Sequence, residues 1–182
     1  DPVVVEFPAE KAAVSGIELI SGYKKAEAPG QLTKSGVDLY PYVFNFFPET
    51  VEDIMFYCEL YNTDKTFGEG EKFVYNYYIE SFETNNILKE FNRSKVATSA
   101  SVLPLMKDFN INQLPSGNYL LVVEIRDQQN EVVTSNQLFF QRSNPDQDIK
   151  IDQIGLFNIE NTFVSDITDE DTLTEYIKSL AP

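Results

Sequence analysis

The chain has 182 residues and a formal net charge of −15 at pH 7, with 42% hydrophobic and 13% aromatic residues, no His and no Trp. Its acidity argues against nucleic acid or an anionic membrane surface as a partner, because both are bound through basic patches. The lack of His removes the commonest general base and metal ligand, a single cysteine (Cys58) excludes an intramolecular disulfide, and no run approaches the ~20 apolar residues of a membrane span.

Three segments are predicted along the chain. Residues 1–14 hold a Val-rich run between two prolines and are predicted to be extended. Residues 15–143 are predicted to form one β-sandwich, and residues 144–182 an acidic linker followed by a helix. Because the first residue is Asp rather than Met, we expect an upstream segment such as a signal peptide to have been removed, which favours export to the periplasm or the cell surface.

Seven runs in the middle segment alternate apolar and polar side chains in the way that is typical of β-strands. Pro41 cannot donate a ladder hydrogen bond, so the second run is expected at a sheet edge or with a bulge there. Residues 82–93 are not assigned, and no helix is predicted among the runs. The pattern predicts an all-β fold, an antiparallel Ig/fibronectin-like sandwich of about seven strands. The runs are 16–23, 36–47, 53–61, 72–81, 94–107, 119–125 and 132–140.

The strongest local signal lies between residues 114 and 141, where two extended runs flank a polar turn at 127–131. This arrangement predicts a β-hairpin. Just before it, Leu114, Gly117 and Tyr119 read L-x-x-G-x-Y, the spacing of the tyrosine corner in Ig-like and fibronectin-like sandwiches. We therefore expect these three residues to have structural roles.

The last segment, 144–182, contains nine acidic residues and two Lys. Thr168 and Asp171 have the spacing of a capping box, with Thr168 as the N-cap. An amphipathic helix is predicted over about 169–180, and because so short a helix is marginal alone, its apolar stripe is expected to dock on the sandwich or on a neighbouring molecule. That stripe consists of Leu173, Tyr176, Ile177 and Leu180.

Three carboxylates in the linker, Asp146, Asp148 and Asp152, are the candidates for a metal site, since oxygen ligands suit Ca²⁺. Their spacing matches no calcium-binding loop, so a solvated linker is the favoured interpretation. No cofactor is predicted, because the chain has neither a Gly-rich phosphate loop nor a metal-ligand spacing of His and Cys. Ser, Thr and Cys58 have no His to activate them as nucleophiles.

Aromatic residues are numerous in the first strands, and alternation places some of them on a face that the main core does not use. An exposed aromatic face would bind a partner protein or stack on sugar rings, because aromatic residues are enriched at both kinds of site. The alternative is that they fill a broad core or lie beneath the C-terminal segment. The candidates are Tyr40, Tyr42, Phe44, Tyr57, Tyr61 and Tyr78.

Three stretches in order, D-L-Y-P-Y-V-F-N-F-F-P at 38–48, L-P-S-G-N-Y-L-L-V-V-E-I-R-D at 114–127 and E-Y-I-K-S-L-A-P at 175–182, resemble the N-terminal β-sandwich region of the GWxTD-domain proteins of Bacteroidetes-type bacteria. The resemblance covers residues 15–182. The G-W-x-T-D signature is absent, as it must be in a chain without Trp. The resemblance implies an exported protein whose defining domain lies beyond Pro182, and it implies no catalytic residues.

These observations predict a non-catalytic binding or assembly module of an exported bacterial protein, which contacts a partner protein or the missing C-terminal domain. A glycan-binding sandwich with exposed aromatics is the alternative. A carboxylate-based glycosidase ranks third, because 29 acidic residues leave room for a catalytic pair. The oligomeric state stays open.

Overall fold

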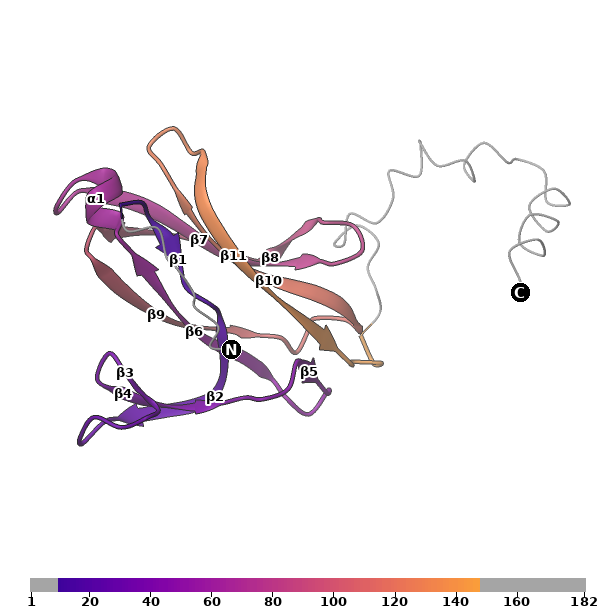
Figure 1. Ribbon diagram of the computed structural model, residues 1–182. Coiled ribbons are helices and arrows are strands. Elements are labelled where there is room, and N and C mark those ends of the chain that lie inside the picture. Colours follow the sequence, from indigo (N-terminus) through magenta and orange to yellow (C-terminus); the bar gives the residue numbers. More distant parts are fainter. Residues whose placement is uncertain (1–9, 148–182) are drawn as a thin grey trace, which may run out of the picture.

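The computed structural model describes residues 10–147, which form an antiparallel-rich β-sandwich of two sheets (Figure 1). Sheet A runs from β9 at one edge through β6, β2 and β4 to β3, with β1 continuing the line of β2 along β6. It holds β1 (Ala13–Val14), β2 (Glu18–Lys25), β3 (Thr33–Lys34), β4 (Val37–Pro41), β6 (Asp53–Tyr61) and β9 (Val102–Asn110).

Sheet B has the order β5-β11-β10-β7-β8, and β5 pairs with β11 in parallel. Its strands are β5 (Phe46–Phe47), β7 (Lys72–Ser81), β8 (Ile87–Thr98), β10 (Gly117–Arg126) and β11 (Val132–Arg142). Seven strands within residues 10–147 have eight residues or more, in agreement with the predicted sandwich of about seven. The predicted hairpin is formed by β10 and β11.

Two predicted strands are each divided in the structure. The run 36–47 contributes β4 to sheet A and β5 to sheet B, because the chain crosses between the sheets after Pro41 and Asn45 O accepts a hydrogen bond from Gln141 N at 2.7 Å. The run 94–107 contains the end of β8 and most of β9. These strands are separated at Ala100, whose N and O both bond to the buried Thr63 hydroxyl, at 2.9 and 2.8 Å.

The structure also contains a short helix, α1 (Thr63–Phe67), where the sequence predicts none. Five residues are too few to produce a helical period in the sequence. The helix is fixed from both sides, because Thr63 bonds to Ala100 and the ring of Phe67 stacks on Phe73 with centroids 5.2 Å apart. The unassigned residues 82–93 contain the turn after β7 and the first half of β8.

The core between the sheets contains the inward side chains of both, with Phe56 and Phe140 among its largest fully buried members. At one end of this core the Tyr119 hydroxyl donates a hydrogen bond to Pro115 O at 3.0 Å, which is the geometry of a tyrosine corner. A Cβ on Gly117 would lie 3.0 Å from that hydroxyl oxygen, so only glycine fits there without displacement. Leu114 is fully buried beside this corner. The predicted cap Thr168 lies outside the described residues.

A second, smaller core lies on the outer face of sheet A. The β3–β4 hairpin, called the flap (residues 33–41), turns at Ser35 and Gly36, whose positive φ angles of 49° and 82° indicate a type I′ turn. Ile20, Leu39 and Tyr57 are buried together there, with Met55 and Met106 packed around them. The flap therefore covers part of a face that would otherwise be exposed.

Candidate functional site

The six predicted binding residues lie in three separate places. Tyr40 and Phe44 are 42% and 65% exposed on β4 and on the crossover that follows it, and Tyr42 beside them packs inward, with its ring stacked on Phe47 at 4.7 Å. Tyr57 and Tyr61 lie on the outer face of sheet A. Tyr78 lies on the outer face of sheet B. The six residues therefore do not form one surface.

Tyr57 and Tyr61 are brought together by a carboxylate that the sequence prediction did not include. Glu59 lies between them on the same face of β6, and its Oε1 accepts a hydrogen bond from the Tyr57 hydroxyl at 2.6 Å, while its other oxygen accepts one from Tyr61. Ser35, from the tip of the flap, donates to the same Oε1 at 3.4 Å. The Lys34 ammonium lies over the Tyr57 ring, 5.7 Å from its centroid.

The charge states in this cluster reinforce one another. Burial opposes the charge on Glu59, but hydrogen bonds from Tyr57, Tyr61 and Ser35 lower the pKa of its carboxyl below the ordinary value. Burial and the bond to Glu59 raise the pKa of Tyr61 to about 12, so this phenol is a donor at neutral pH. Both oxygens of the carboxylate are thus occupied. We interpret the cluster as a latch that ties the flap to β6; the alternation Y-x-E-x-Y at 57–61 is the sequence signal for it.

Replacing Glu59 by Gln is expected to destabilise the fold at pH 7 and to matter less in acid. A carboxylate whose pKa is lowered by folding contributes stability above its unfolded pKa of about 4.3, and this contribution is lost as the pH falls through the folded pKa. Urea unfolding of the unchanged protein and of Glu59→Gln measures the difference in their free energies of unfolding at pH 7 and again at pH 3. The exposed Glu131→Gln change is the control, expected to be neutral at pH 7. Equal differences at both pH values for Glu59→Gln would contradict the latch.

The outer face of sheet B carries an apolar surface, which we call the sheet B patch. Its centre is a buried cluster on β7 and β10, packed against Phe139 of β11. Phe82 is 51% exposed, and its ring meets that of Phe139 edge-on with centroids 5.2 Å apart. Phe46 of β5 is paired in register with Gln141 and joins the same face, 45% exposed. The patch consists of Phe46, Tyr78, Phe82, Leu120, Val122 and Phe139.

Polar side chains border the patch on two sides. On one side Glu124, only 3% exposed, accepts hydrogen bonds from Arg126 Nε at 2.6 Å, from Asn76 at 2.9 Å and from the Tyr78 hydroxyl at 3.2 Å. On the other side Asn118 donates to Glu83 at 2.7 Å and accepts from Gln141 at 2.9 Å. An apolar centre with a polar rim is the usual anatomy of a protein–protein interface.

The other candidate sites have simpler positions. Cys58 is fully buried in the core, and burial raises the pKa of its thiol to about 12. Asp146 is exposed, whereas Asp148 and Asp152 lie outside the described residues. Between residues 10 and 147 no three His, Cys, Asp or Glu side chains are grouped so that they could hold a metal ion. Over the same range, no helix has the length and apolar character needed to cross a membrane.

Comparison with known proteins does not assign a family. No family model matches the chain, and no curated protein matches it. Similar folds occur in a glycosyl hydrolase family 2 member from Bacteroides cellulosilyticus (TM-score 0.36, 14% identity, 50% of this chain and 13% of that one). They also occur in the extracellular domain of a one-component system protein from B. thetaiotaomicron (TM-score 0.31, 18% identity, 72% of this chain and 16% of that one). A third match is the β-glucosidase of Kluyveromyces marxianus (TM-score 0.30, 11% identity, 70% of this chain and 15% of that one).

This chain therefore covers less than a fifth of each of those proteins. At these TM-scores and identities, the matches assign neither a family nor a function to this chain. The resemblance to the GWxTD-domain proteins stays a prediction.

Proposed function

We propose that this chain is a non-catalytic binding or assembly module of an exported bacterial protein, and that it acts by protein–protein contact through the sheet B patch. The observation that supports this proposal is the position of Phe82. This large ring is half exposed, and it lies against the apolar centre of the patch and within reach of the polar rim. Aromatic anchors in such surroundings supply much of the energy of protein interfaces.

The energy available from this ring is enough to matter for a weak or moderate complex. A Phe side chain buries 150–250 Å², so covering the exposed half of Phe82 would remove roughly 100 Å² from water. At about 25 cal/mol per Å² this gives about 2.5 kcal/mol. Phe46 is exposed to a similar extent at the neighbouring edge, and its contribution would add to that of Phe82.

A catalytic carboxylate pair is not favoured on this face. Glu80 and Glu124 share it, and burial together with the charge of Glu124 raises the pKa of Glu80. Both carboxyl groups of a glycosidase pair must reach the substrate, whereas Glu124 is only 3% exposed and already accepts hydrogen bonds from three donors.

The test replaces Phe82 by Asp and, as the matched control, Phe44 by Asp. Both rings are exposed, but only Phe82 belongs to the patch. Light scattering after size exclusion would measure self-association, and titration with any polypeptide that the gene encodes after Pro182 would measure binding to that polypeptide. We expect one of these contacts in the unchanged protein and in Phe44→Asp, and its loss in Phe82→Asp.

A glycan array run with the same three proteins separates the alternative. Sugar binding by a monomer that is lost in Phe44→Asp and kept in Phe82→Asp would favour the glycan-binding module. The role of the sheet B patch would be contradicted if the unchanged protein showed neither self-association nor binding to that polypeptide. It would also be contradicted if Phe82→Asp and Phe44→Asp affected the contact equally.

A further inference from the structure

The second surface of interest lies where the two sheets meet along one side of the sandwich. Strand β8 is the edge of sheet B, and β9 is the edge of sheet A. The two edges are in contact, because the Arg93 guanidinium of β8 lies 5.4 Å from the centroid of the Phe109 ring of β9 and the Phe91 ring lies 6.0 Å from the same ring. We call this side the β8–β9 seam.

Basic side chains gather along this seam. Arg93 and Lys95 are paired in register with the core residues Tyr77 and Tyr75, so their side chains point toward the opening between the sheets. Lys107 is paired in the same way with the core residue Phe56. Lys89, on the same strand as Arg93, is also exposed. None of these four forms an ion pair among the salt bridges of the described residues.

The charge of the seam contrasts with the charge of the chain. Its two strands carry four cations and two carboxylates, Glu90 and Asp108, whereas the whole chain has a net charge of −15. Charged side chains that point inward at an edge strand protect it from pairing with another sheet. That role accounts for charged residues on both edge strands, and because four of the six are cations the seam also has a local excess of positive charge.

The chain contains a segment with the complementary charge. Residues 166–175 carry five carboxylates and no cation. The 18 residues 148–165 join them to the described part and span up to about 60 Å when extended. A strand of 12 residues is about 40 Å long, so the segment can reach any point of the seam.

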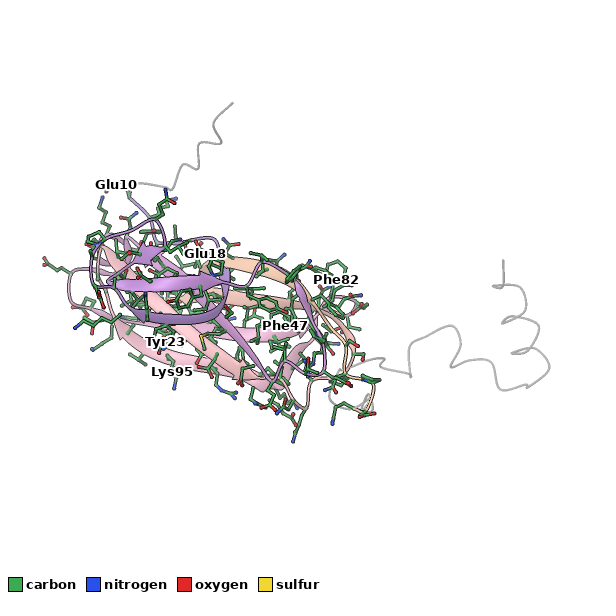
Figure 2. All side chains as sticks on the ribbon, turned by 90° about the horizontal axis from the view of Figure 1, so that it is seen from below. Glu10, Glu18, Tyr23, Phe47, Phe82 and Lys95 are labelled. Carbon is green, nitrogen blue, oxygen red and sulfur yellow. The ribbon has the colours of Figure 1, made fainter. Side chains whose placement is uncertain are left out.

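We propose that the acidic segment 166–175 of this chain docks on the β8–β9 seam, where its carboxylates pair with Arg93, Lys95 and Lys107. This contact is independent of the sheet B patch, and Figure 2 shows Lys95 and Phe82 on different sides of the molecule. Because the pairs are exposed, the contact weakens as salt shortens the Debye length from about 10 Å at 0.1 M to about 3 Å at 1 M.

The experiment uses the full chain with Thr172→Cys carrying a nitroxide. The native Cys58 is fully buried, so the new cysteine is the one that reacts. Paramagnetic broadening of backbone amide signals then reports which part of the sandwich lies near residue 172. At low ionic strength we expect broadening centred on residues 93–95 and 105–107, and we expect most of it to disappear in 1 M NaCl.

Two charge-reversal pairs give the comparison. Lys95→Glu with Lys107→Glu should abolish the broadening, whereas Lys11→Glu with Lys25→Glu, the same change in net charge at exposed positions elsewhere, should leave it in place. The amide spectrum of the rest of the sandwich verifies that each variant is folded.

The proposal is overturned if the β8 and β9 amides show no broadening at low salt, or if the broadening survives Lys95→Glu with Lys107→Glu. It is also overturned if the effect appears only between molecules, in a mixture of ¹⁵N-labelled protein without the nitroxide and unlabelled protein with it. These results do not depend on Phe82, so they test the seam separately from the proposed function.

Discussion

Arg126→Met is expected to lower the free energy of unfolding by about 3 kcal/mol, the lower end of the cost of breaking a buried ion pair, because Glu124 is buried but the Arg126 side chain is 22% exposed. Glu124 is only 3% exposed and receives its shortest hydrogen bond, 2.6 Å, from Arg126 Nε. Without the guanidinium, the carboxylate keeps only the neutral donors Asn76 and Tyr78. Arg126 also donates to Asn130 O in the β10–β11 turn, and that bond would be lost as well.

The double variant Glu124→Leu with Arg126→Met tests whether the cost comes from the uncompensated charge. Removing both charges is often nearly neutral in other proteins. Here Asn76 and Tyr78 would each lose an acceptor. We therefore expect the free energy of unfolding of the double variant to be about 1 kcal/mol lower than that of the unchanged protein. Urea unfolding measures all three proteins. If the double variant is as unstable as the single one, the loss does not come from the buried charge.

Phe56→Ala should be among the most damaging single changes in the core, lowering the free energy of unfolding by about 3–5 kcal/mol. Its ring is fully buried on β6 and meets Tyr77 of β7 across the interior, with centroids 5.8 Å apart. The deletion leaves a cavity between the two sheets. At pH 7, urea unfolding is expected to show a lower midpoint with a similar slope.

Phe44→Ala is the matched control, because the same chemical change is made on a ring that is 65% exposed. We expect it to change the free energy of unfolding by less than about 0.5 kcal/mol. Comparable losses in the two variants would mean that the crossover after β4 is packed more tightly than its exposure indicates.

Sequence patterns predicted the strands whose two faces differ clearly. The predicted runs 53–61 and 72–81 coincide with β6 and β7, since each strand has one face in the core and ends at a turn with polar residues or glycine. Elements fixed by tertiary contacts were not predicted. The break between β8 and β9 depends on Thr63, more than 30 residues away, and α1 has only five residues.

The candidate site was harder to predict than the fold, because it depends on register between distant strands. Tyr78 belongs to the buried centre of the sheet B patch, and its role in binding stays a prediction. Phe82, Phe139 and Phe46 were not predicted, because they come from a turn, from β11 and from β5, and nothing in the sequence shows that the three share a face. The cluster around Glu59 requires the flap to fold back onto β6, which alternation does not reveal.

The described chain begins and ends at opposite ends of the sandwich (Figures 1 and 2). At one end Glu10 pairs with Lys65 of α1, and at the other Asn144 donates to the backbone of Asn112 and Leu114. A pull on these two points would act on β1 at one end and on β11 at the other, the first and last strands of the described chain. The ladder bonds between β11 and β10 would then be loaded together in shear rather than opened one by one, so this hairpin would resist the pull more strongly than the two-residue strand β1.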